Sequence, residues 1–94
     1  MSQAEICGAI RDQKLLSFMY SGRRREVEPH LLGYDSDGDL TLSAWQLEGG
    51  SGQGWRDFHV SKLSGLTIGL TGFAGPRPGY NPNDETIDQI VCRL

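Results

Sequence analysis

The sequence predicts a mainly β domain, a small closed or nearly closed five-stranded β-barrel with an N-terminal α-helix and an irregular C-terminal strap. Three observations predict it. A single amphipathic segment opens the chain, and five short apolar or alternating runs follow, separated by turn residues. Glycine and proline are also frequent. The chain holds 13 glycines and 4 prolines among 94 residues, a share of about 18%, whereas average usage would give roughly 12%. We expect a barrel because closure would remove exposed strand edges. No linker splits the chain, so we expect one domain over residues 1–94.

The opening segment predicts a helix over about residues 3–13. Ser2 and Glu5 form a Ser-x-x-Glu pattern typical of a capping box, in which each side chain bonds a free backbone N–H of the first turn. Ile6, Cys7 and Ile10 recur at helical spacing, while the polar residues 11–13 are expected to face outward. One apolar stripe of this kind must dock on the rest of the domain.

The barrel is expected over about residues 15–70. Its five strands are bounded by turn signals such as Ser21-Gly22 and Asp35-Ser-Asp-Gly38, and the glycine-rich segment Gly49–Gly54 is expected to be a flexible loop. Pro29 cannot donate a ladder hydrogen bond, so the second strand should bulge there or lie at an edge. The expected strands are residues 15–20, 25–34, 40–47, 55–60 and 66–70.

The C-terminal strap is expected over residues 71–94. Residues 71–83 have no periodicity, and an irregular segment of this length on a small domain should pack over the barrel or bind something. Residues 84–92 are expected to form one or two helical turns, with Ile87 and Ile90 facing inward.

Composition limits the classes of protein. No apolar run approaches the roughly 20 residues that cross a bilayer, and the polar start lacks the pattern of a signal peptide, so we expect a cytoplasmic protein without a membrane partner. Two cysteines are too few for a disulfide scaffold, and Cys7, on the apolar side of the expected helix, is expected to be a buried free thiol. The hydrophobic content of 37% is too high for a disordered tail.

Charge is light but unevenly distributed. The net charge of −3 disfavours non-specific coating of DNA. Five of the nine basic residues lie between Arg11 and Arg25, whereas the acidic residues gather at the turn 35–39 and after Asn81. A small, localised basic site is therefore compatible with the acidic total.

Four segments in register resemble the WYL domain family, over roughly residues 6–70. The segments are Ala9-Ile-Arg-Asp-Gln-Lys-Leu-Leu-Ser-Phe-Met-Tyr20, Arg25-Glu-Val-Glu-Pro-His-Leu-Leu-Gly-Tyr34, Asp39-Leu-Thr-Leu-Ser-Ala44 and Trp55-Arg-Asp-Phe-His-Val-Ser-Lys-Leu63. The resemblance implies an Sm-like or SH3-like barrel with a sensory or binding role. WYL domains usually follow a DNA-binding helix-turn-helix in bacterial transcription regulators, and some bind short single-stranded nucleic acid.

The chain departs from that family in three ways. The Trp-Tyr-Leu element reads Leu40-Thr41-Leu42, and the closing basic residue is Lys62 in place of arginine, which replaces a planar fork with a point charge. No DNA-binding domain precedes the barrel, so we expect a stand-alone member and not a complete regulator.

The resemblance places a ligand site on Tyr20, Arg25, His30, Arg56 and Lys62. The two arginines can hold a phosphate or carboxylate through paired N–H donors, and Lys62 adds charge. Tyr20 offers a ring for base stacking, and His30 titrates near neutral pH.

Each of these residues also has a purely structural interpretation. Arg56 shares the apolar strand face of Phe58, where a charge needs a partner, and an internal ion pair with Glu28 or Asp57 would serve equally well. Tyr20 would be a core aromatic. His30 would be a polar residue at a strand edge whose ring nitrogens find hydrogen-bond partners within the protein.

Trp45 is a further candidate, on the more polar face of its strand with Thr41 and Ser43. There it would either stack on a ligand or partner, or pack beneath the C-terminal strap.

No enzyme, metal site or cofactor is expected. His30, His59 and the two cysteines lack zinc-ligand spacing, and the glycine loop has no Gly-Lys-Ser/Thr ending of a P-loop. The leading hypothesis is a ligand-sensing or accessory regulatory domain that binds a small anionic ligand, foremost short single-stranded nucleic acid or a nucleotide. The alternative is a protein–protein interaction module, including a homodimer, that uses Trp45, Trp55 or residues 73–80 while the arginines are structural.

Overall fold

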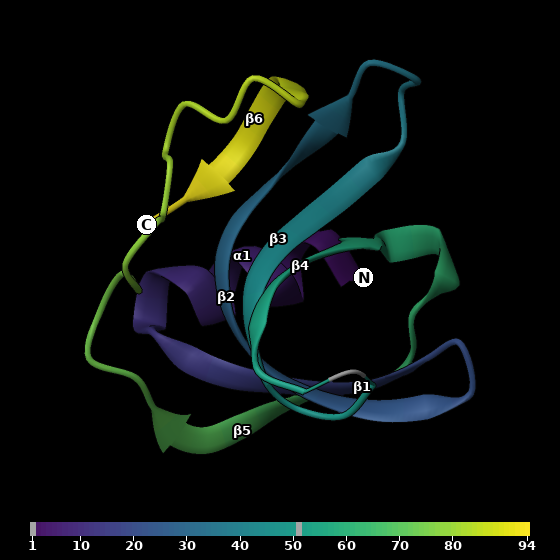
Figure 1. Ribbon diagram of the computed structural model, residues 1–94, viewed down its shortest axis with the longest axis vertical. Coiled ribbons are helices and arrows are strands. Elements are labelled where there is room, and N and C mark those ends of the chain that lie inside the picture. The colour runs from purple at the N-terminus through teal and green to yellow at the C-terminus, as the bar shows by residue number, and fades with distance from the viewer. Residues whose placement is uncertain (1, 51) are drawn as a thin grey trace.

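One helix and six strands make up the fold in the computed structural model, which describes residues 2–50 and 52–94 (Figure 1). The strands form a mainly antiparallel sheet in the order β4-β3-β2-β1-β5, and β6 pairs with β2 outside this path. The elements are α1 Ser2–Asp12, β1 Lys14–Tyr20, β2 Arg23–Asp35, β3 Leu40–Glu48, β4 Gly54–His59, the 3₁₀ turn η1 Val60–Lys62, β5 Ser64–Gly72 and β6 Ile87–Arg93.

Strand β2 is the centre of the sheet. Its first half pairs with β1 from Leu16↔Val27 to Tyr20↔Arg23, and its second half pairs with β6. Strand β3 runs beside both halves, with a register shift between Pro29 and Leu31. The bulge predicted from Pro29 is therefore confirmed, since a proline without an N–H is accommodated where the ladder is broken.

The sheet is open, so the expected barrel closure is not what the strand pairing gives. Strands β4 and β5 end the path, and no pairing joins them among the described residues. The mainly β fold with one N-terminal helix is confirmed. The count of five strands is wrong, because the C-terminal segment adds a sixth.

The sixth strand corrects the helix expected over residues 84–92. Residues Ile87–Arg93 are extended and pair with β2, and this pairing depends on Gly33. A Cβ at Gly33 would lie 2.6 Å from the carbonyl oxygen of Gln89 and would also meet the Ile87 side chain. A tertiary contact thus outweighs the local capping signal, and only residues 73–86, here called the β5–β6 connection, remain irregular.

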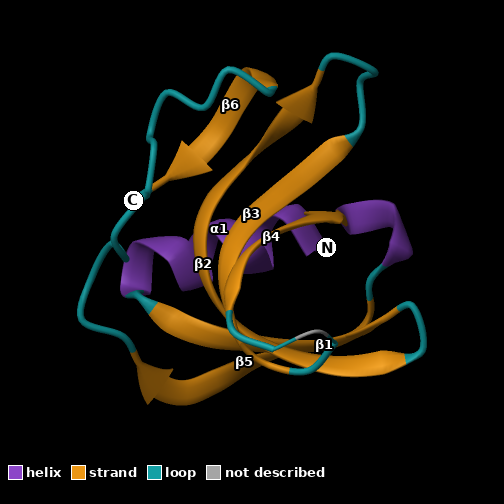
Figure 2. Ribbon diagram, in the orientation of Figure 1, coloured by secondary structure: helices purple, strands orange, loops and turns teal. Residues whose placement is uncertain are grey.

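Helix α1 lies against the sheet (Figure 2), and the burial of its residues shows that the predicted face points inward. Ile6, Ala9 and Ile10 are buried and pack with Leu16, Phe18 and the other core residues. The side chain of Ser2, the predicted cap, lies outside the described residues. Within the described chain, no helix combines the length and the apolarity needed to cross a lipid bilayer.

Cys7 is not the free thiol that the sequence predicts. It forms a disulfide with Cys92, which joins α1 to β6 across a sequence separation of 85 residues, with the two Cα atoms 5.8 Å apart. The helix and the last strand meet because β6 returns the chain end to β2, beside the helix. Sequence alone could not show this pairing, since β6 was expected to be helical.

Removing this disulfide should lower stability substantially. Because the bond closes most of the chain into one loop, the loop-entropy model gives about 4 to 5 kcal/mol of stabilisation. We expect a Cys7→Ala/Cys92→Ala variant, and wild type in dithiothreitol, to unfold at matching lower urea concentrations. The variant should not respond to the reductant. Equal midpoints for oxidised and reduced wild type would contradict the expectation.

Candidate functional site

The six predicted site residues lie in separate groups because consecutive strand residues point to opposite faces. Trp45 precedes Gln46 on β3, and Trp55 precedes Arg56 on β4, with Trp45 paired to Trp55 across the two strands. One face therefore carries Arg56 with Tyr20 and Arg25. The other face carries Trp45 together with His30.

Arg25 is the best-defined member of the first group. Its guanidinium carbon lies 5.7 Å from the centre of the Tyr20 ring and 5.9 Å from that of Phe58. One Nη donates to Gln46 Oε1 at 2.9 Å, and the other donates to the Tyr20 carbonyl oxygen at 3.2 Å. Its Nε is buried without a partner. Among the described residues, no carboxylate lies within ion-pair distance of Arg25.

Gln46 organises this site, and sequence reasoning missed it. The side chain is fully buried, and its Nε2 donates to the carbonyl oxygens of Gly49 and Gly52 at 2.7 and 2.6 Å. The amide thus ties the glycine loop to Arg25. The available signal was an amide on the same strand face as Leu42 and Ala44, where a polar side chain must find partners.

The glycine loop runs close to the start of β2 and to the Arg56 side chain. At Gly49, whose φ is +104°, a Cβ would collide with the Arg24 backbone carbonyl oxygen, so glycine is required there. A Cβ at Gly50, whose φ is +51°, would lie 2.6 Å from an Arg25 Nη. A Cβ at Gly54 would lie 2.9 Å from an Arg56 Nη. The residue between the described parts of this loop, Ser51, lies outside the structural description.

Arg56, on β4, also contacts this loop. It donates to the Trp55 carbonyl oxygen at 2.7 Å and to that of Gly52 at 3.3 Å. The expected internal pair with Glu28 is wrong, because Glu28 lies on the other face and bonds Arg77. Arg56 therefore lies close to Arg25 through the loop.

Tyr20 and Lys62 differ in how they could contact a ligand. The Tyr20 hydroxyl accepts the backbone N–H of His59 at 3.2 Å, and the half-buried ring packs edge-on against Phe58 at 5.0 Å. Tyr20 is thus bound into the protein at both its ring and its hydroxyl. Lys62 is exposed at the end of η1.

His30 is not placed to meet a ligand. It is fully buried, and Nε2 accepts the backbone N–H of Arg77 at 3.1 Å. Nδ1, 2.8 Å from the Glu28 carbonyl oxygen, must then carry the proton and donate it. Burial lowers the pKa of His30 most, opposed by the hydrogen bond to the Glu28 carbonyl and by the Glu28 charge. The expected ligand contact is replaced by a neutral, structural imidazole.

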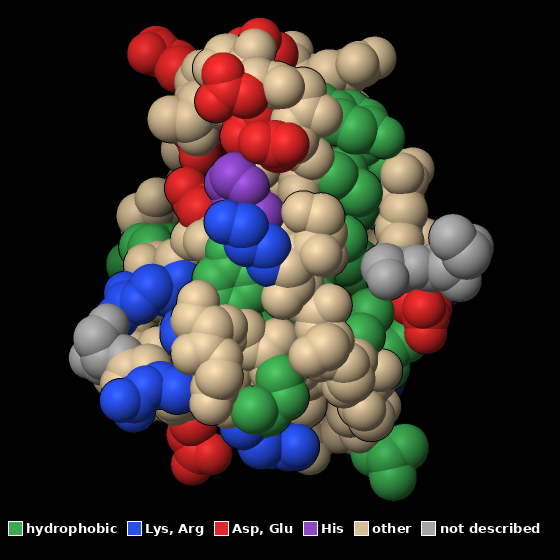
Figure 3. Space-filling model, turned by 90° about the vertical axis from the view of Figure 1, so that its right-hand side faces the viewer, with side chains coloured by type: hydrophobic (Ala, Val, Ile, Leu, Met, Phe, Trp, Pro, Cys, Tyr) green, Lys and Arg blue, Asp and Glu red, His purple; other side chains and the backbone are tan. Residues whose placement is uncertain are grey.

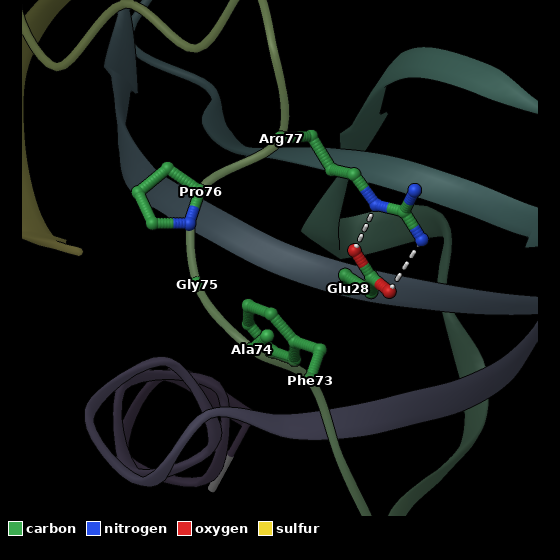
Figure 4. Close-up of a pocket in the computed structure, with 6 residues that line it drawn as sticks. All are labelled: Glu28, Phe73, Ala74, Gly75, Pro76 and Arg77. Carbon is green, nitrogen blue, oxygen red and sulfur yellow. Dashed lines mark hydrogen bonds and ion pairs between the residues drawn. The ribbon is translucent and has the colours of Figure 1, made fainter.

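Arg77 contacts both members of the second group, His30 and Trp45, and also pairs with Glu28 (Figure 4). Its Nε and Nη2 donate to the two carboxylate oxygens of the buried Glu28 at 2.7 and 3.0 Å. Its guanidinium also lies over the Trp45 ring at 5.3 Å. Trp45 therefore packs beneath the C-terminal segment, which is one of its two predicted interpretations.

An aromatic cluster holds the rest of the β5–β6 connection on this face. His30 contacts Trp55, Phe73 and Tyr80 with ring centres 4.8 to 5.5 Å apart. Trp55 Nε1 donates to the Pro78 carbonyl oxygen at 3.0 Å. The connection is therefore bound by rings and hydrogen bonds along its length.

Two hollows adjoin this connection, and neither suits an anion. The larger, about 450 Å³, lies between Glu28 and residues 73–77, where the carboxylate already pairs with Arg77. The smaller, about 190 Å³, includes Asp57 and Asp84 in its lining. Loss of solvation and then the charge of Asp84 raise the pKa of Asp57, so the smaller hollow repels anions.

Asp35, Asp39 and His59 bring ligand-type atoms within 4.8 Å of one another. Asp35 Oδ1 already accepts the backbone N–H groups of Asp37 and Asp39. The hydrogen bond from Asp39 is the chief reason that the pKa of Asp35 is lowered. Hydrogen bonds within the β2–β3 turn explain why Asp35 and Asp39 lie together, and His59 reaches Asp39 from β4, with Nδ1 3.7 Å from Oδ2.

The charges on the visible surface are separated (Figure 3). Acidic side chains gather at the top of this face, and basic side chains lie below them and to the left. Arg23 and Arg24 are exposed at the start of β2, next to the half-buried Arg25. The basic surface thus includes the β1–β2 hairpin.

A scan against protein-family models, a search of curated proteins and a search of solved structures each find no match to this chain.

The neutral His30 should make stability depend on pH. The imidazole has a lowered pKa in the folded state, whereas in the unfolded chain it binds a proton near pH 6.5. The unfolded state then binds more protons, so the stabilisation is complete above about pH 6.5 and declines as pH falls toward the folded pKa. Urea unfolding from pH 8 to 5.5 measures it.

Two variants test whether His30 is the group responsible for this pH dependence of stability. A His30→Gln variant should lose most of this slope, and a His59→Gln variant should retain it. A slope unchanged in His30→Gln would refute the assignment.

Proposed function

We propose that this chain is a binding domain, without catalytic activity, for a small anionic ligand, foremost a short single-stranded nucleic acid. The ligand would lie on the face formed by the β1–β2 hairpin, the glycine loop and β4. Arg25 would be the central contact, with Arg56 and the exposed Arg23 beside it, whereas Arg24, which points to the opposite face, would add positive charge at the same hairpin.

The observation that supports this most is the environment of Arg25. Its guanidinium is half-buried beside two aromatic rings that contact each other, and its contacts in the described chain are all to neutral groups. Withdrawing a charge from water is costly unless it is paired. A phosphate at this face would supply the missing negative charge through charge-assisted hydrogen bonds.

An extended ligand on the arginine face is favoured over a nucleotide enclosed in either hollow beside the β5–β6 connection. Both described hollows adjoin the β5–β6 connection and carry carboxylates. A single strand can instead follow an open basic surface, with phosphates on arginines and bases against ring edges. Lys62, exposed on η1, is an additional contact for a longer strand.

We also propose that the chain is a stand-alone relative of the WYL domain family with an open variant of an Sm-like or SH3-like barrel. Two features of the sheet support this. The strand order is β4-β3-β2-β1-β5, and β2 pairs with β1 along its first half and with β6 along its second half. A sensing or accessory role in transcription regulation would follow from that relationship.

The protein–protein alternative has less support from the same geometry. Trp45, Trp55 and residues 73–80 are engaged with one another through Arg77, His30 and Tyr80, so these aromatics are already used within the chain. A partner at that face would have to bind their remaining exposed edges.

The cytoplasmic location remains a prediction, and the Cys7–Cys92 bond counts against it. Disulfides persist mainly in oxidising compartments. Alkylation of thiols in intact cells, followed by a gel-mobility assay, would show in which state the pair exists there.

Nucleic-acid binding is tested by fluorescence polarisation with labelled eight-residue DNA and RNA strands at low salt. We expect an Arg25→Gln variant to bind about 10- to 100-fold more weakly, the range for one hydrogen bond to a charged group. The double variant Arg23→Gln/Arg24→Gln should remain folded and give a smaller salt dependence, because it makes fewer phosphate contacts.

The matched control is Arg11→Gln, which removes an exposed arginine on α1 that pairs with Asp12. It should bind as wild type does. Absence of binding by wild type at low salt, or equal weakening in the Arg11 and Arg25 variants, would reject the proposed function. Thermal unfolding of each variant separates lost binding from lost folding.

A further inference from the structure

The outer edge of β5 is an open strand edge. Strand β5 ends the sheet path, and β1 is its only pairing partner in the described chain. It lies at the lower boundary of the sheet, with no helix or strand drawn beyond it (Figure 1). Such an edge presents unpaired backbone N–H and C=O groups to another strand.

The composition of β5 does not prevent such pairing. Its nine residues, Ser-Gly-Leu-Thr-Ile-Gly-Leu-Thr-Gly, include no charge and no proline. By contrast β4, at the other end of the path, has six residues and carries Arg56 and Asp57. Charges, short length and β-bulges are the usual protection of an edge, and of these β5 has only its two register shifts against β1, which flank Thr67 and Ile68. A charge also lies beside β5 at Lys14, whose Nζ donates to the Leu70 carbonyl oxygen at 3.3 Å.

Exposed apolar side chains gather at the same edge. In the described chain the exposed large hydrophobic residues are Met19, Ile68 and Leu70, at 40%, 41% and 96%. Two of them lie on β5, and Met19 pairs with Ser64 of that strand. The lower part of the face in Figure 3 likewise shows apolar side chains that project into solvent.

The sequence of β5 matches itself in an antiparallel pairing. With a two-fold axis at Ile68, Leu66 lies opposite the second copy's Leu70, and Thr67 lies opposite its Gly69. Ile68 then lies opposite its own counterpart. Cross-strand apolar pairs of this kind stabilise a sheet, and a two-fold contact requires this self-complementarity. The proposed axis lies in the regular part of the β1–β5 ladder, because Thr67 and Ile68 pair with β1 in normal register and the two register shifts lie on either side of them.

We propose that β5 is a dimerisation edge, at which a second copy of this chain adds its own β5 in antiparallel orientation to give one continuous sheet. The uncharged strand avoids like-charge repulsion between two chains of net charge −3. The contact is small, so association is weak and concentration-dependent. This surface is distinct from the Arg25 face, and the proposal stands or falls independently of anion binding.

Sedimentation velocity from about 10 µM to 1 mM protein, a range that covers weak affinities, tests the association. Wild type should shift toward dimer as concentration rises. Leu70→Lys should remain monomeric, and its folding is safe because the side chain is almost fully exposed. Gln3→Lys adds the same charge on exposed α1 and should dimerise as wild type does. A monomeric wild type, or a Leu70→Lys variant that dimerises normally, overturns the proposal.

The two-fold register has its own test at Ile68. Ile68→Lys and Ile68→Glu should each be monomeric, because like charges would face each other at the axis. An equimolar mixture should form a heterodimer, since the lysine would then face the glutamate. If the mixture stays monomeric while circular dichroism shows both variants folded, the proposed register is wrong.

Discussion

The bidentate contact of Arg77 with the buried Glu28 determines how the C-terminal third of the chain lies on the sheet. The backbone N–H of Arg77 also satisfies His30, and its guanidinium covers Trp45. One residue therefore meets the hydrogen-bonding needs of two buried polar groups, which would be costly to leave unpaired. With the β5–β6 connection fixed in this way, β6 can return to β2 and bring Cys92 to Cys7.

This arrangement separates the aromatic face from the core-facing side of the sheet, where Arg25 and Arg56 are half-buried at the end next to the glycine loop. The aromatic face is occupied by the protein's own chain, so its histidine and tryptophan stabilise the fold. On the opposite face, Gln46 and the glycine loop hold Arg25 and Arg56 close together, while their charges stay near the surface. The same sheet therefore neutralises one buried charge internally, while among the described residues no carboxylate pairs with Arg25.

Local patterns predicted the helix, five of the strands and the bulge at Pro29, because periodicity, turn residues and missing donors act over a few residues. They failed where distant segments decide the structure. Residues 84–92 pair with β2 only because Gly33 leaves room for them, and the partner of Glu28 is Arg77, 49 residues away. Arg25 and Tyr20 were predicted and do lie together. Gln46 was missed, although its place among apolar residues was a usable signal.

A ¹⁵N NMR titration with a short single-stranded DNA tests the division of faces most directly. The account predicts that shifts concentrate in the backbone of the β1–β2 hairpin around Arg25 and in the glycine loop. His30, Arg77 and the β5–β6 connection should change little. Shifts centred on Trp45, Trp55 and Tyr80, with none around Arg25, would contradict the account and place binding on the aromatic face.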